Sequence, residues 1–205
     1  MCKAMRTSAP PLAAPIILAS LSPTRAQILA EHGITFIQMD SGFDEESLAI
    51  CEPAKFAYIA CVKKLESSLE LLAKQGKYDH ALDSGLLCAD SVVSVDGKLL
   101  RKARDKQEAR NMLELQDSKR ISILTALAYK SRHISFTDLS ACHLELGKFE
   151  LDDMLGYVDS LAWQGKAGCV MVEGFHKRYI RRQIGLESSA LGLSIEKLVR
   201  FWEIV

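Results

Sequence analysis

The chain alternates short apolar runs with segments in which apolar residues recur every three or four positions. A short apolar run predicts a buried strand, whereas the three-to-four spacing predicts an amphipathic helix. Strands are expected at 16–19, 34–39, 86–89, 121–128, 133–146, 169–172 and 179–184, and residues 91–95 are expected to continue extended after Asp90. Helices are expected at 23–32, 53–72, 105–115, 151–160 and 194–202. Strands that alternate with helices in this way are typical of an α/β fold.

Local signals fix two of these boundaries. Ser22 is a favourable N-cap, Pro23 suits the first helical position, and Gly33 is suited to end the same helix. After the third strand, Asp96-Gly97 is a strong signal for a two-residue hairpin turn. We therefore expect a helix directly after the first strand and a hairpin directly after the third.

Length and composition indicate one globular domain. The chain has 205 residues, of which 48% are hydrophobic and 25% charged, a composition that excludes disordered and fibrous proteins. No internal repeat or linker divides it, so we expect a single domain over residues 15–205. Residues 1–14 are expected to form a loose N-terminal extension. Lys3 and Arg6 before an apolar run imitate a signal peptide, but the prolines near that run and the lack of a clean cleavage site argue against one.

Charge and cysteine usage restrict the classes of partner. Lysine and arginine total 26, as do aspartate and glutamate, and this balance argues against a protein that coats nucleic acid or an anionic membrane. No stretch approaches the roughly 20 apolar residues that span a bilayer. The six cysteines form no Cys-x-x-Cys motif, which favours a reduced, cytoplasmic chain without structural zinc. We expect no nucleic-acid or membrane partner.

The segment that joins the first strand to the first helix is suited to bind phosphate. It reads Leu-Ala-Ser-Leu-Ser-Pro-Thr-Arg over residues 18–25. A helix N-terminus presents free N–H groups and the positive end of the helix dipole, where an anion is stabilised. Ser20 and Ser22 add hydroxyl donors, and Arg25 adds a guanidinium fork. The alternative is an ordinary N-cap beside a surface arginine.

Carboxylates and lysines follow at other element ends. Asp90 ends an apolar strand, and the acidic run 44–46 lies in a loop. Lys63 and Lys64 lie on the long helix expected at 53–72, and Lys102 follows the hairpin. Each has an ordinary alternative, namely a turn cap, a solvated loop or surface lysines. Together they could hold Mg²⁺ and a phosphate chain. Neither a Walker A motif nor Gly-x-Gly-x-x-Gly occurs, so P-loop and Rossmann sites are excluded.

These segments, in this order, resemble the Maf family. The run at 18–25 is similar to the family's opening L-A-S-x-S-P-x-R, and Cys-Ala-Asp-Ser-Val-Val at 88–93 to its A-D-T-V-V. Further short matches, in register from Ile16 to the C-terminus, lie at 43–45, 59–63, 96–97, 102, 125–126, 166–168, 172–174 and 192–193.

The resemblance implies a fold and an activity. Maf proteins are associated with septum formation and are known as nucleotide pyrophosphatases. Their fold is a mixed twisted β-sheet flanked by helices with a central cleft, similar to inosine triphosphate pyrophosphatases. They cleave a nucleoside triphosphate to the monophosphate and pyrophosphate with a divalent metal, Mg²⁺ or Mn²⁺. The implied roles are clearance of modified or surplus nucleotides and a link to cell division arrest, and the usual state is a homodimer.

The resemblance also assigns roles to individual residues. Asp90 would be the catalytic carboxylate, and Glu45 with Asp90 would bind the metal. The expected phosphate-binding residues are Ser20, Ser22, Arg25, Lys63 and Lys102. These roles fit the chemistry, because charge develops on the leaving pyrophosphate while the attacking water needs orientation or deprotonation.

Departures from the family pattern leave the substrate open. Thr24 stands where a second arginine is common, Arg101 and Ala103 replace glycine and proline, Glu173 replaces glutamine, and Ser194 replaces a proline. Ala-Asp-Ser favours the branch that acts on dTTP and UTP, whereas Ser-Pro-Thr-Arg and Glu-Gly-Phe favour the branch that acts on 7-methyl-GTP. Two alternatives to the pyrophosphatase stay open: a nucleotide-binding regulator of septum formation without turnover, and a diphosphate or dinucleotide hydrolase.

Overall fold

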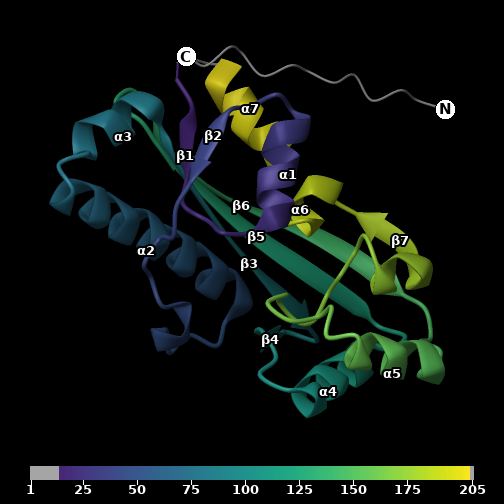
Figure 1. Ribbon diagram of the computed structural model, residues 1–205. Helices are drawn as coiled ribbons and strands as arrows, with labels where there is room; N and C mark the ends of the chain where they lie inside the picture. Colours follow the sequence, from purple (N-terminus) through teal and green to yellow (C-terminus); the bar gives the residue numbers. More distant parts are fainter. Residues whose placement is uncertain (1–13, 204–205) are drawn as a thin grey trace.

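The computed structural model describes residues 14–203 and confirms the predicted α/β class (Figure 1). The strands are β1 Ile16–Leu18, β2 Phe36–Gln38, β3 Leu86–Val95, β4 Lys98–Leu100, β5 Arg120–Lys130, β6 Ser135–Leu146 and β7 Ile180–Ile184. The longer helices are α1 Pro23–Glu31, α2 Pro53–Lys74, α3 Tyr78–Ser84, α4 Lys106–Gln116, α5 Leu151–Asp159 and α7 Ile195–Glu203. Short turns of helix are η1 Glu45–Ser47, η2 Phe175–Tyr179 and α6 Glu187–Ala190. The predicted extension 1–14 lies outside the described residues except for Ala14, and so does Cys2.

The strands form one mixed, seven-stranded open sheet, as the resemblance implied. Its order is β2-β1-β3-β5-β6-β7, with β4 paired to β3 outside this path. β1 runs parallel to β2 and β3. β3 pairs antiparallel with β5, β5 with β6, and β6 with β7. The Asp96-Gly97 turn joins β3 to β4, and both turn residues have positive φ, as this hairpin type requires.

One edge of β3 is left unpaired in its middle. β1 pairs with β3 only as far as Leu87, and β4 begins to pair at Val93. Between these two points no strand within residues 14–203 pairs with β3 on that side. Asp90 lies in this gap, inside a longer strand and not at a strand end as predicted, because β3 continues to Val95. In Figure 1, β1 and β2 accordingly lie beside one end of β3 and β4 beside the other. The unpaired edge therefore leaves space for a cleft beside the middle of this central strand.

Alternating side chains of the long strands build the core on both faces of the sheet. On one face, α2 packs on residues such as Cys88 and Ala128. On the other face, α1 and α7 pack on the half that contains Leu87, whereas α4 and α5 pack on the half that contains Val95. These two helix groups stand apart in Figure 1. The space between them lies beside the gap in β3.

One predicted strand is wrong. Residues 169–172 form turns, and the nearest ladder contact is a single bridge between Lys102 and Ala167. Gly165, Gly168 and Cys169 all have positive φ, which a strand does not accommodate. The apolar residues of this segment are partly or fully buried against α4 and α5, so burial rather than strand pairing explains the apolar run. Helix α3 was not predicted.

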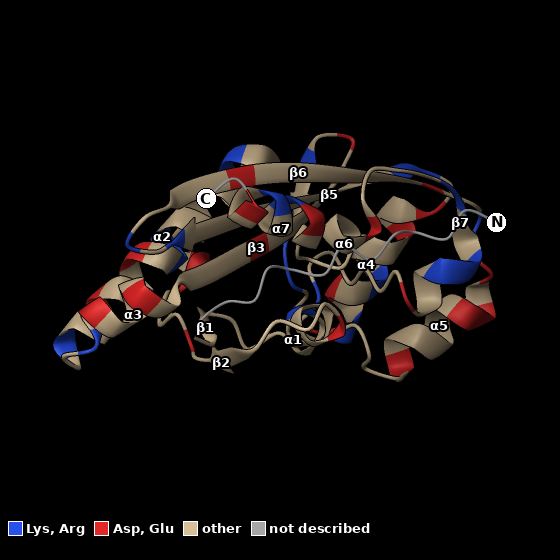
Figure 2. Ribbon diagram, turned by 90° about the horizontal axis from the view of Figure 1, so that it is seen from above, with Lys and Arg blue, Asp and Glu red and all other residues tan. Residues whose placement is uncertain are grey.

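Basic and acidic residues occur on helices and loops throughout the ribbon and are not confined to separate parts of the molecule (Figure 2). Among residues 14–203, no helix has both the length and the hydrophobicity that crossing a membrane demands. The cysteines within this range are all free.

Candidate active site

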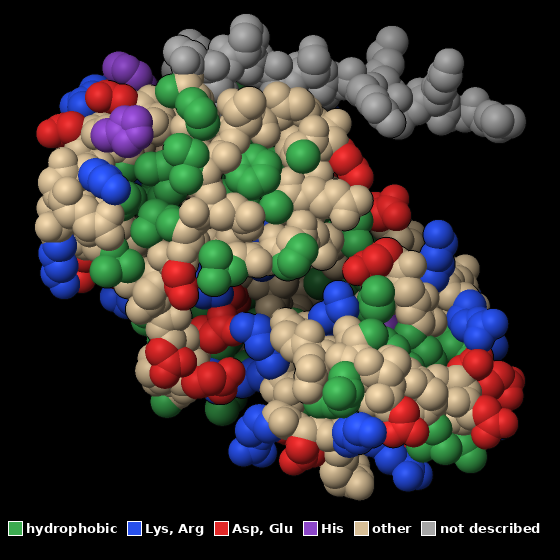
Figure 3. All heavy atoms as spheres, in the orientation of Figure 1, with side chains coloured by type: hydrophobic (Ala, Val, Ile, Leu, Met, Phe, Trp, Pro, Cys, Tyr) green, Lys and Arg blue, Asp and Glu red, His purple; other side chains and the backbone are tan. Residues whose placement is uncertain are grey.

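A cleft of about 900 Å³ opens at the unpaired edge of β3. Figure 3 shows it as a hollow across the middle of the molecule, with acidic and basic side chains gathered at one end. Every site residue predicted from the sequence lines this cleft except Lys63. Segments far apart in the chain are thus brought to one place, namely the β1–α1 loop, η1, β3 and the loop after β4.

The β1–α1 loop forms one wall, as its sequence predicted. The side chain of Ser22 accepts a hydrogen bond from the Arg25 backbone N–H at 3.4 Å and caps α1, with Pro23 in the first turn. The hydroxyl of Ser20 accepts from the Ser22 backbone N–H at 3.3 Å. The N-terminus of α1 therefore faces the cleft, where its dipole favours an anion. Thr24 also lines this wall.

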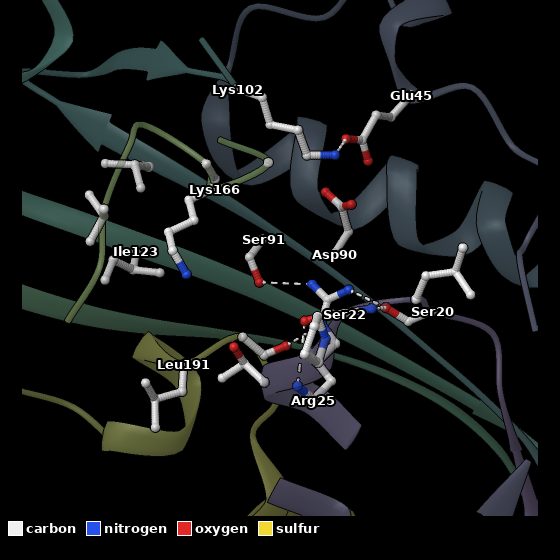
Figure 4. A pocket seen from close by; sticks show the side chains of 18 of the residues that line it. Ser20, Ser22, Arg25, Glu45, Asp90, Ser91, Lys102, Ile123, Lys166 and Leu191 are labelled. Carbon is white, nitrogen blue, oxygen red and sulfur yellow. Dashed lines mark hydrogen bonds and ion pairs between the residues drawn. The ribbon is translucent and has the colours of Figure 1, made fainter. Parts of the chain in front are cut away.

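Arg25 is held from three sides. Its guanidinium donates to the Ser20 hydroxyl at 2.9 Å, the Ser91 hydroxyl at 3.3 Å and the Gly192 carbonyl at 2.8 Å (Figure 4). Ser91 in turn bonds Thr125 at 2.8 Å. Because three partners hold the guanidinium and Thr125 supports one of them, its positive charge is preorganised at the cleft wall.

Two carboxylates and two lysines form the opposite wall. The Lys64 ammonium contacts Asp90 and donates to Glu45 at 2.6 Å, and the Lys102 ammonium contacts the second oxygen of Glu45. Asp90 comes from β3, Glu45 from η1 and Lys64 from α2. Figure 4 shows Lys102, Glu45 and Asp90 across the pocket from Ser22 and Arg25. The geometry brings together both carboxylates and two of the three lysines that the sequence singled out, Lys64 and Lys102.

Burial and charge move the pKa values of the two carboxyl groups in opposite directions. Burial raises the pKa of Asp90 to about 6, although the Lys64 ammonium acts to lower it. Burial acts on Glu45 in the same direction, but Lys64 and Lys102 outweigh it and hold the pKa of Glu45 well below its usual range. Burial lowers the pKa of Lys64, yet Asp90 and Glu45 outweigh this and leave it raised. Asp90 is therefore the group whose proton can be exchanged near neutral pH.

Lys63 is not brought into the cleft. Its side chain is 49% exposed and pairs with Glu66 at 2.8 Å on the solvent side of α2. The side chain of Lys64 is only 13% exposed and occupies the place that the prediction gave to Lys63. The helical period explains the difference, because Lys64 lies four residues from the buried Ala60 and four from the buried Ser68. This spacing could have identified Lys64 from the sequence.

The other end of the cleft is largely apolar. Its lining includes Val93, Ile123, Val170 and Leu191. At its rim, Lys166 lies 3.6 Å from Glu173. Figure 4 shows Lys166 reaching into the pocket near Ile123, away from Asp90. The cleft therefore has a charged end for an anion and an apolar end for a planar, weakly polar group.

Buried hydrogen bonds anchor the loop that carries Lys166. Gln116 donates to the Gly168 carbonyl at 2.7 Å, and its side-chain oxygen bonds His176 Nε2 at 3.0 Å. The Met171 backbone N–H donates to His176 Nδ1 at 3.1 Å, so Nε2 carries the imidazole proton. Burial lowers the pKa of His176 to about 3, which keeps the ring neutral. Sequence patterns gave no sign of this anchor.

The donor set suits a divalent metal that is shared with a substrate. Within residues 14–203, no group of three or more His, Cys, Asp or Glu side chains is arranged to hold a metal. Glu45 and Asp90 nevertheless place two carboxylates within reach of one ammonium group. Mg²⁺ is commonly bound through one or two carboxylates plus substrate phosphates and water. The residues present therefore fit Mg²⁺ or Mn²⁺ bound together with a phosphate chain.

Comparisons with known proteins agree on one family. The family model described as "Maf-like protein" matches residues 15–204. A protein of Helicobacter pylori is 42% identical over 184 residues, which cover 90% of this chain and 93% of the relative. A protein of a Nitratiruptor species is 40% identical, with 89% and 96% covered, and one of Campylobacter jejuni is 39% identical, with 89% and 97% covered. All three relatives are named nucleoside triphosphate pyrophosphatase.

Proposed function

The chain belongs to the Maf-like protein family, and from this membership we propose that it hydrolyses a nucleoside triphosphate to the monophosphate and pyrophosphate. The name shared by its relatives supports the reaction. The observation that carries it is the Asp90–Lys64–Glu45 cluster, which faces Arg25 across one cleft. This arrangement supplies both the cations that a triphosphate needs and a carboxylate with a raised pKa.

The residues divide into two roles in this proposal. Arg25 and Lys102 bind phosphate oxygens, together with the hydroxyls of Ser20 and Ser22 and the N-terminus of α1. Asp90 accepts a proton from the attacking water, and its raised pKa places it closer to the working pH than an ordinary carboxylate. Lys64 neutralises charge beside it. The oxygen of this water bonds to the α-phosphorus as the bond between the α and β phosphates breaks, and the pyrophosphate leaves.

We propose that Glu45 and Asp90 bind Mg²⁺ or Mn²⁺ together with the phosphates. The bound metal would polarise the phosphate oxygens and neutralise the charge that develops on them. Lys64 already pairs with both carboxylates in the protein itself, and Lys102 adds a second positive charge beside Glu45. The cluster can therefore keep two carboxylates close together before substrate binds.

We propose that the nucleobase binds at the apolar end of the cleft. Ile123, Val170 and Leu191 offer it a nonpolar surface, and Lys166 and Glu173 offer polar contacts at the rim. Two classes of substrate remain candidates: dTTP and UTP form one class, and 7-methyl-GTP forms the other. The biological role we propose is clearance of modified or surplus nucleotides in the cytoplasm. The homodimer and the link to cell division arrest remain predictions.

The alternative is a nucleotide-binding regulator of septum formation without turnover. Thr24 motivates it, because that position lines the cleft without the second positive charge that is common in the family. Binding without hydrolysis would distinguish this protein from an enzyme.

One assay separates these functions. The protein is incubated with dTTP, UTP, 7-methyl-GTP and the common triphosphates, with Mg²⁺ or Mn²⁺, and orthophosphate is measured with and without added inorganic pyrophosphatase. We expect orthophosphate only when pyrophosphatase is added, because the primary product is pyrophosphate. Orthophosphate without that addition would contradict the proposal. Binding of a triphosphate with no product in either arm would favour the regulator.

A further inference from the structure

Arg101 lies beside the cleft but does not line it. It follows β4 and precedes Lys102, at a position where the sequence departs from its family. Its guanidinium turns toward the loop that carries Glu45. The backbone at this position does not adopt a positive φ, so the chain here does not depend on glycine. The arginine therefore has a contact set of its own, separate from the phosphate-binding wall.

The guanidinium connects three points of the acidic loop. It donates to the Glu46 carboxylate at 2.9 Å, to the Glu45 carbonyl at 3.1 Å and to the Leu48 carbonyl at 3.0 Å. These bonds reach two residues of the single turn η1 and Leu48, the residue directly after it. A planar guanidinium with several fixed donors can hold such a turn, whereas a lysine ammonium cannot reproduce the fork.

Arg101 also ties this loop to the long helix. Its guanidinium carbon lies 4.4 Å from the centre of the Phe56 ring on α2, a cation–π geometry. Phe56 is buried and packs in the core beneath the sheet. The same helix supplies Lys64, which contacts both carboxylates of the cluster. The loop with Glu45 and the helix with Lys64 are thus fixed to each other by a side chain outside the cleft.

We propose that Arg101 is a positioning residue that holds the Glu45 carboxylate in place opposite Lys64, Lys102 and Asp90. This inference rests on the proposed function, because it assigns Arg101 a role in the hydrolysis of the triphosphate. η1 is a single turn, and none of its residues is fully buried. Without Arg101, the η1 backbone loses its hydrogen bonds to the guanidinium, and Glu45 is left with its side-chain contacts to Lys64 and Lys102. Glu45 then loses its alignment while Asp90 and Arg25 keep theirs.

The effect should appear in turnover and should depend on Glu45. A displacement of about 1 Å in a catalytic group can cost on the order of 10²-fold in rate. We expect Arg101→Ala to lower kcat by about that factor, and Arg101→Lys to restore little of it because the fork is lost. In a Glu45→Gln background, adding Arg101→Ala should cost far less, since residues that act through one another are not additive.

The experiment is a double-mutant cycle of Arg101→Ala and Glu45→Gln. Steady-state kinetics of pyrophosphate release, calorimetric binding of an α,β-methylene triphosphate and thermal unfolding are measured on wild type, both single variants and the double variant. Arg104→Ala is the matched control, because Arg104 lies on the same loop, is 87% exposed and pairs only with Glu108 among the described residues. Glu46→Gln removes one contact of the fork and should have a smaller effect than Arg101→Ala.

The outcomes separate this inference from the proposed function. If wild type releases no pyrophosphate, the proposed function fails. The positioning role would still be supported if Arg101→Ala weakened binding of the analogue in the wild-type background but not in the Glu45→Gln background. If wild type is active and the kcat losses of the two substitutions simply multiply in the double variant, the positioning role is overturned. An Arg101→Ala variant with wild-type kinetics would overturn it as well. A folded variant whose loss disappears in the Glu45→Gln background supports it.

Discussion

The ammonium of Lys64 contacts the carboxylate of Asp90 at the buried end of the cleft. Both side chains are largely shielded from water. They come from separate elements, Lys64 from α2 and Asp90 from β3. Removing one partner of such a pair leaves an uncompensated buried charge. The relationship therefore makes Lys64, rather than its neighbour Lys63, the lysine of α2 on which the site depends.

The two adjacent lysines of α2 provide a matched test. Lys64→Ala should lower kcat by about 10²-fold, because it removes a preorganised charge next to both carboxylates. Lys63→Ala should leave kcat and KM unchanged, since its side chain only pairs with Glu66 on the surface. Steady-state kinetics of both variants would check this. Equal losses in the two variants, or a greater loss in Lys63→Ala, would contradict the placement of these side chains.

Replacing the carboxylate of Asp90 should stop turnover without unfolding the protein. Asp90→Asn preserves the shape of the side chain but removes the proton acceptor, and loss of a general base costs about 10²–10⁴-fold. The fold should persist, because Lys64 keeps its ion pair with Glu45 and the neutral amide relieves the burial of a charged group. Pyrophosphate release and thermal unfolding give the two readouts. A rate near that of wild type would remove Asp90 from the reaction.

The activity should depend on the protonation of Asp90. Because its pKa is raised to about 6, the carboxylate form predominates above this pH and disappears below it. We expect kcat/KM, which reports the free enzyme, to fall as the pH is lowered through about 6, while Glu45, whose pKa is lowered, stays ionised. The profile is measured at substrate concentrations well below KM between pH 5 and pH 8. A flat kcat/KM across this range would contradict a base with this pKa.

The same group makes a prediction for stability. Between its ordinary pKa of 3.8 and about 6, Asp90 keeps a proton in the folded protein that it loses in the unfolded chain. The free energy of unfolding attributed to Asp90 should therefore decrease as the pH rises through this window. Urea denaturation of wild type and Asp90→Asn at several pH values measures it. The difference between the two proteins should change across the window, and a constant difference would contradict the raised pKa.

Two glycines in the loop that carries Lys166 separate backbone strain from steric conflict. Gly165→Ala should cost about 1–2 kcal/mol, because φ is positive there but the added methyl group meets open space. Gly168→Ala should cost about 1–3 kcal/mol more, since its Cβ would lie 2.7 Å from Val93 Cβ. Urea denaturation compares the two variants. Equal destabilisation would show that contact with Val93 does not restrain this loop.

Much of the fold follows from local signals in the sequence. The Ser22 cap with Pro23, the Asp96-Gly97 turn and the long apolar runs identify the first helix, the hairpin and the central strands. The strand predicted at 169–172 is wrong because its apolar residues are buried although the backbone there does not form a strand. A pattern of apolar residues cannot distinguish the two cases. The gap in β3 could not be predicted, since it depends on where β1 and β4 stop pairing.

The candidate site shows the same division. Motif positions identified Ser20, Arg25, Glu45 and Asp90, all of which line the cleft. The phase of α2 was needed to choose Lys64 over Lys63, and motif matching alone does not use it. The contacts of Arg101 and the anchor formed by Gln116 and His176 are tertiary, so no local pattern in the sequence indicates them.

The central claim is the position of the bond that breaks, and ³¹P NMR of the products tests it most directly. Wild type and Asp90→Asn are incubated with the best triphosphate of the panel and a divalent metal, and the spectra are followed over time. The account predicts resonances of the nucleoside monophosphate and pyrophosphate for wild type, with no nucleoside diphosphate, and an almost unchanged triphosphate for Asp90→Asn. Accumulation of nucleoside diphosphate and orthophosphate in the wild-type reaction would contradict it.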